Sequence, residues 1–84
     1  MAYGNEFREE FLKNNPDKQI ISCSHRVFHG YGTSKYIVEW SGDWTVSELV
    51  NYCDGTTGNF GGRIDNLRET ENGNHKGTVC VYYD

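Results

Sequence analysis

The segment from Thr45 to Gly55 constrains the fold most, because it carries helix signals at both ends. Thr45 is a good N-cap residue, and Glu48 follows it at the capping-box spacing. Apolar side chains then recur at positions i, i+3, i+4 and i+7 of one helical face: Val46, Leu49, Val50 and Cys53. Gly55 stands where a glycine commonly ends a helix. The sequence therefore predicts a short amphipathic helix in the middle of the chain.

The chain before this helix predicts a β-hairpin. Gln19 to His29 is rich in β-formers and has no helical period. Side chains of alternate residues would share one face of this strand: Ile21, Cys23, His25, Val27 and His29. Gly30 to Ser34 supplies turn residues, and Lys35 to Trp40 predicts the partner strand, with Tyr36 and Val38 on the same face as Trp40.

The chain after the helix predicts a second hairpin. A glycine-rich connector runs from Thr56 to Gly62. The strand predicted for Arg63 to Glu69 carries Ile64 and Leu67 at positions of opposite parity, which indicates either a β-bulge or a later start of the strand. The tight-turn dipeptide Asn72-Gly73 follows, and Thr78 to Tyr83 closes the chain as a strand of alternating pattern.

A first helix is predicted for Asn5 to Lys13. Phe7, Phe11 and Leu12 fall on one side of a 3.6-residue period. The acidic residues near the start of the segment and Lys13 near its end both suit the helix dipole. Pro16 ends the segment, because a proline pushes the residue before it out of the α region.

These elements predict one α+β domain spanning residues 1–84, in the order α-β-β-α-β-β. The expected architecture is a four-stranded, mainly antiparallel sheet with two helices on one face. A chain of 84 residues is long enough for one core and no more. The strand orders 1-2-4-3 and 2-1-3-4 both satisfy the connections, and the sequence does not choose between them.

Charge and cysteine usage narrow the function. The net charge of −4 disfavours a protein that binds nucleic-acid phosphates, which requires clustered cations. The three cysteines form no disulfide framework, and the chain has neither a signal-peptide pattern nor an apolar run of membrane-spanning length. We therefore expect a cytoplasmic protein that does not bind a membrane.

No residue pattern predicts catalysis or a cofactor. Cys23, His25 and His29 have ligand chemistry, but their spacing matches no zinc motif and the chain has no C-x-x-C. The glycine-rich connector leaves a helix and contains no lysine, so it is not a phosphate-binding loop. We predict a non-enzymatic protein with no resident metal.

Aromatic richness is the remaining signal, because six tyrosines and two tryptophans occur in this short chain. Such side chains dominate protein interfaces. Trp44, Tyr36 and one C-terminal tyrosine are predicted core residues, whereas Tyr31 and Phe60 are predicted to be exposed. The proposed partner-binding residues are Tyr31, Trp40, Phe60, Glu69, Glu71 and Tyr82. They predict a protein-interaction module (an adaptor, regulator or inhibitor) whose acidic surface suits a basic protein partner.

Two alternatives remain open. One is a small-ligand or nucleotide-binding module, with an exposed sheet edge that would allow homo-oligomers. The other is a single-stranded nucleic-acid binder, with cations that could line one sheet face: Arg26, Lys35, Arg63, Arg68 and Lys76. By analogy of size alone, the main hypothesis also fits accessory proteins of phages and mobile elements, including anti-defence inhibitors.

Overall fold

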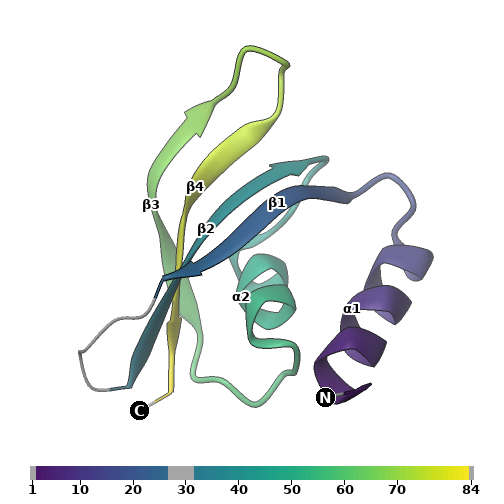
Figure 1. The fold of residues 1–84 in the computed structure, drawn as a ribbon, viewed down its shortest axis with the longest axis vertical. Helices are drawn as coiled ribbons and strands as arrows, with labels where there is room; N and C mark the ends of the chain where they lie inside the picture. Colours follow the sequence, from purple (N-terminus) through teal and green to yellow (C-terminus); the bar gives the residue numbers. More distant parts are fainter. Residues whose placement is uncertain (1, 27–31, 84) are drawn as a thin grey trace.

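The computed structural model describes residues 2–26 and 32–83 and confirms the predicted order of elements (Figure 1). Two helices and four strands follow one another as α1 (Ala2–Asn14), β1 (Gln19–Arg26), β2 (Thr33–Ser41), α2 (Val46–Asp54), β3 (Gly62–Glu69) and β4 (His75–Tyr82). Among the described residues, no helix is long and apolar enough to cross a bilayer.

The four strands form one antiparallel sheet in the order β1-β2-β4-β3, with both helices on the same side (Figure 1). This is the first of the two orders that the sequence allowed. The core explains why β2 and β4 are central, because Val38, Val79 and Val81 are completely buried. The edge strand β1, by contrast, exposes every side chain from residue 21 to residue 25.

Helix α2 begins and ends as predicted. Thr45 Oγ1 accepts a hydrogen bond from Glu48 N at 3.1 Å, and Thr45 N donates to Glu48 Oε1 at 2.8 Å, which completes the capping box. Gly55 has a φ of 80° and donates its N–H to Asn51 O, as an αL C-cap does. The helix buries Leu49, Val50 and Cys53 against the sheet.

The predicted bulge in β3 is confirmed between Asp65 and Arg68. Asn66 has a φ of 57°, the left-handed conformation that asparagine tolerates better than most residues. Ile64 pairs with Val79 and Glu69 pairs with His75, so the extra residue leaves Ile64 and Leu67 on the helix-covered face. The opposite parity of the two apolar residues in the sequence is thereby explained.

A second bulge, in β1, was not predicted. The register shifts between Ile20, which pairs with Trp40, and Ser22, which pairs with Glu39. Ile20 packs against the core, whereas Ile21 is 49% exposed. Val27 and His29, predicted to continue this strand, lie outside the described residues.

Three elements begin earlier in the sequence than predicted. Strand β2 begins at Thr33 and β4 begins at His75, because the two strands pair along their whole length, from Thr33 with Tyr82 to Trp40 with His75. Helix α1 begins at Ala2, which leaves no acidic side chain in its first turn. The prediction of acidic residues at the start of the helix dipole is therefore wrong, whereas Lys13 lies in the last turn as predicted.

Helix α1 reaches the core through α2 rather than through the sheet. Arg8 donates from Nε to Tyr52 O at 2.8 Å and from a terminal guanidinium nitrogen to Cys53 O at 2.9 Å. The Phe11 ring lies 5.0 Å from the Trp44 ring, which meets the Tyr52 ring edge-on at 5.6 Å. Trp44 thus connects the two helices and, as predicted, packs against the core.

Candidate functional site

An apolar hollow lies where β2, α2, β3 and β4 meet. Its volume is about 240 Å³, and we call it the Trp40 hollow. Eight residues line it: Trp40, Gly42, Asp43, Trp44, Val46, Ile64, Leu67 and His75. The hollow is the candidate site because side chains from four separate elements converge on it.

The floor of the hollow is held by the central pair of strands. Trp40 is only 4% exposed, and its backbone pairs with that of His75 across β2 and β4. The Trp40 and His75 rings are 6.0 Å apart and tilted by 33°. The neighbouring Trp44 is fixed by a 3.0 Å hydrogen bond from its Nε1 to Ser41 O. Contacts within the fold therefore hold both tryptophans in place.

The rim carries two of the large apolar side chains that the described part of the chain exposes to solvent. Val46 is 43% exposed and Leu67 is 62% exposed. Val46 follows the N-cap of α2, so it stands at the end of the helix where the hollow opens. Leu67 reaches the hollow because the bulge at Asn66 returns it to the helix-covered face. Exposed apolar side chains around a hollow are typical of binding sites.

The charges around the hollow are acidic. Asp43 lines it and is exposed, and Glu69 is exposed on the face that it shares with His75. Three cations are sequence neighbours of lining residues, but the strand register places them on the opposite face of the sheet: Arg63, Arg68 and Lys76. The arrangement can receive an apolar side chain and attract a basic residue beside it.

The five predicted partner-binding residues that the structure describes do not form one surface. Trp40 lies in the hollow, but it is a core residue and little of its ring is exposed to solvent. Glu69 is exposed on β3 and pairs with His75 of the hollow, and Glu71 is exposed in the turn that follows β3. Phe60, which is 72% exposed as predicted, donates its backbone N–H to Tyr82 O at the other end of β4. Tyr31 lies outside the described residues.

Sequence reasoning missed most of the hollow. The lining residues that it did not propose as partner-binding are Gly42, Asp43, Trp44, Val46, Ile64, Leu67 and His75. One signal pointed to Leu67: the bulge expected from its parity implied that it shares a face with Ile64. The other residues are distant in the sequence, and only the strand order brings them together.

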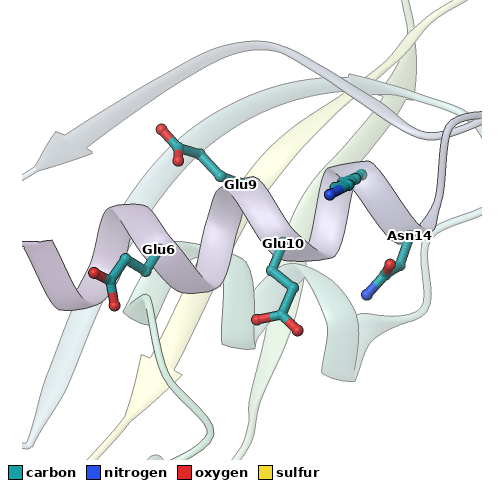
Figure 2. A pocket seen from close by; sticks show the side chains of 5 residues that line it. Glu6, Glu9, Glu10 and Asn14 are labelled. Carbon is teal, nitrogen blue, oxygen red and sulfur yellow. The ribbon is translucent and has the colours of Figure 1, made fainter.

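The surface of α1 is a second hollowed region, of about 380 Å³, and it is strongly acidic. Figure 2 shows Glu6, Glu10 and Asn14 along one side of the helix, and Glu9 and Lys13 complete the lining. All five residues belong to a single helix, so no second element closes the space. This surface contributes to the acidic character of the protein, and its hollow is lined by one helix alone.

The metal hypothesis gains no support from the described residues, among which no group of three His, Cys, Asp or Glu side chains could hold an ion. His25 instead stacks on Tyr36, with ring centroids 4.6 Å apart. His29 lies outside the described residues. No family model matches the chain, and comparison with curated proteins and with solved structures gives no match either.

Proposed function

We propose that the domain is a non-enzymatic protein-interaction module whose Trp40 hollow binds a partner segment with one large apolar side chain next to basic residues. The observation that carries this proposal is the exposure of Leu67 and Val46 beside a preformed aromatic floor. Binding energy at interfaces concentrates where an anchor side chain fills such a hollow. Asp43 and Glu69 supply the charge that favours a basic neighbour.

The volume of the hollow favours a side chain over a small-molecule ligand. Sites for drug-sized ligands and cofactors usually measure about 300–1,000 Å³. The Trp40 hollow has about 240 Å³ and opens to solvent at its exposed rim. One anchor side chain is therefore a better match than a nucleotide.

A displayed peptide library tests this proposal without a known partner. We expect enrichment of peptides that carry a large apolar residue flanked by Lys or Arg. Leu67→Asp should weaken their binding by about tenfold or more, because it places a charge at the anchor position. Ile21→Asp is the matched control, since Ile21 is also exposed but does not line the hollow. Enriched peptides that bind Leu67→Asp and the unmodified protein equally would disprove the assignment.

The helix-free face of the sheet supports a second candidate function, single-stranded nucleic-acid binding. The register places Lys35, Arg63, Arg68 and Lys76 on this face. However, Arg63 is bonded to Asp65 at 3.0 Å, and Lys76 pairs in register with Glu39. These carboxylates reduce the positive potential, so we rank this function second. Its test is oligonucleotide binding, which should weaken steeply with added salt and on Arg68→Glu.

A further inference from the structure

The two edge strands of the sheet differ in how well they are protected against pairing with another strand. Strand β3 is interrupted by the bulge at Asn66, where φ is 57°. It also carries four charged residues: Arg63, Asp65, Arg68 and Glu69. Charged side chains and bulges are devices that natural proteins use to keep an edge strand from joining a second chain. The β3 edge is therefore protected against such pairing.

The opposite edge, β1, lacks this protection along most of its length. The sequence from Gln19 to His25 contains no Lys, Arg, Asp, Glu or Pro. The bulge of this strand lies near its start, between Ile20 and Ser22. Every side chain from residue 21 to residue 25 is exposed, so neither helix covers this stretch. Because β1 pairs only with β2, alternate residues direct their backbone N–H and C=O groups away from the sheet. The fold thus presents a template for one further strand.

A second copy of β1 suits this edge in length and in charge. Antiparallel pairing about a twofold axis uses the same patch on both chains, so the two strands match in length. The two ends of β1 have opposite charge, because the exposed Asp17 precedes the strand and Arg26 ends it. Lys18, the other charge at the start, is paired with Glu48 at 2.7 Å. Antiparallel pairing therefore directs the acidic start of each strand toward the basic end of the other.

We propose that β1 pairs antiparallel with β1 of a second copy, with the pair centred on Cys23, and so joins two four-stranded sheets into one. The exposed stretch from residue 21 to residue 25 is itself centred on Cys23. Centring the pair on Ser22 would place Lys18 opposite Arg26, and like charges directly opposite are destabilising. Centring it on Ser24 would shorten the overlap of the two strands.

This pairing determines which faces of the two copies meet. Ser22 and Ser24 pair in register with Glu39 and Ile37 of β2, so both serines lie on the helix-free face. Directly opposite residues of antiparallel strands point to the same face. Ser22 of each copy therefore lies opposite Ser24 of the other. The helices of both copies consequently lie on one side of the joined sheet, together with both Trp40 hollows.

The interface is small, so the dimer should be weak and should depend on concentration. Complexes that bury less than about 1,200 Å² in total are typically transient. No residue of β1 lines the Trp40 hollow, so pairing leaves the hollow free. A dimer would therefore offer two hollows to a partner with two suitable segments, which raises the overall affinity without a new contact. The pairing itself does not depend on what the hollow binds.

Sedimentation equilibrium over a concentration series tests the pairing, and the unmodified protein should show a monomer–dimer equilibrium. Two double variants place like charges opposite one another: Ser22→Lys with Ser24→Lys, and Ser22→Glu with Ser24→Glu. Each should weaken the dimer by about tenfold or more. The two variants move the net charge of −4 in opposite directions, so loss of the dimer in both identifies local repulsion. An equimolar mixture should restore a dimer with one copy of each, because every Lys then faces a Glu.

Ser47→Lys with Thr57→Lys is the matched control. It adds two positive charges at exposed positions outside β1 and should dimerise as the unmodified protein does. Thermal melts establish that each variant is folded. Hydrogen exchange of the unmodified protein is an independent measurement: the amides of β1 that β2 does not bond should exchange more slowly at high than at low concentration, and those of β3 should not change. A monomer at every concentration, a dimer that survives both double variants, or a loss that the mixture does not reverse would each overturn the proposal.

Discussion

Lys18 Nζ lies 2.7 Å from Glu48 Oε2, so an ion pair joins the residue before β1 to the first turn of α2. The other carboxylate oxygen of Glu48 accepts the Thr45 N–H at 2.8 Å. One side chain therefore completes the helix cap and connects the N-terminal half of the chain to α2.

Replacing Glu48 should separate these two roles. Glu48→Gln retains a side chain that can complete the capping box but removes the charge, and should cost about 0.5 kcal/mol of unfolding free energy. Glu48→Ala removes both contacts and should cost about 1–2 kcal/mol. Urea denaturation measures the difference in unfolding free energy. Glu71→Gln, a change at an exposed turn residue, is the control. Equal losses in both Glu48 variants would show that the capping hydrogen bond contributes nothing beyond the charge.

The same pair predicts a pH dependence. The hydrogen bond from Lys18, followed by that from the Thr45 N–H, lowers the pKa of Glu48 in the folded protein. Because the folded pKa is below the unfolded value of about 4.3, the stabilisation is complete above that value and is lost as the pH falls through the folded pKa. The difference in melting temperature between the unmodified protein and Glu48→Gln should accordingly shrink below about pH 4. A constant difference down to lower pH would contradict this assignment.

The bulge in β3 predicts an unusual response at Asn66. Its φ of 57° admits glycine freely, whereas a β-branched residue there should cost about 1–2 kcal/mol. Asn66→Gly should fold with nearly unchanged stability, and Asn66→Val should be destabilised and should shift the amide resonances of Leu67 and neighbouring residues in the Trp40 hollow. Denaturation and amide chemical shifts check the two effects. Similar behaviour of the two variants would mean that the bulge does not depend on the left-handed residue.

Helix α1 should detach more readily than the sheet unfolds. Arg8→Met removes the two hydrogen bonds to the end of α2 while retaining most of the aliphatic bulk. We expect faster hydrogen exchange throughout α1, with little change in the amides of β2 and β4. Lys13→Met, an exposed change on the same helix, is the control. Equal acceleration in α1 and in the central strands would show that the helix and sheet unfold together.

Local sequence signals predicted the helices and strands, but they did not predict which strands lie side by side in the sheet. The cap residues Thr45, Glu48 and Gly55 define α2 through contacts within a few residues, so they were sufficient for its boundaries. Strand order depends on which strands can be buried on both faces. Val79, Cys80 and Val81 are consecutive buried residues, which identifies β4 as central, and this pattern was present in the sequence but was not used.

The candidate site was harder to predict because its geometry depends on that order. Trp40 was recognised as an aromatic surface candidate, but its pairing with His75 across the sheet buries it. Leu67 and Val46 come from different elements and meet only when β3 lies beside β4 and α2 packs over both. Val46 belongs to the apolar period of α2 but is exposed at the helix start, and Leu67 is exposed beside a bulge, so a periodic pattern alone predicts neither exposure.

The central pairing of β2 with β4 also has a consequence for how the chain reaches this structure. Neither local hairpin contains a complete core, because the buried side chains of β2 and β4 come from opposite halves of the polypeptide. Pairing β2 with β4 closes a long loop, and the entropic cost of that closure comes before most of the apolar side chains are buried. Folding should therefore be a cooperative and comparatively slow event, and a fragment that lacks either hairpin should remain largely unstructured.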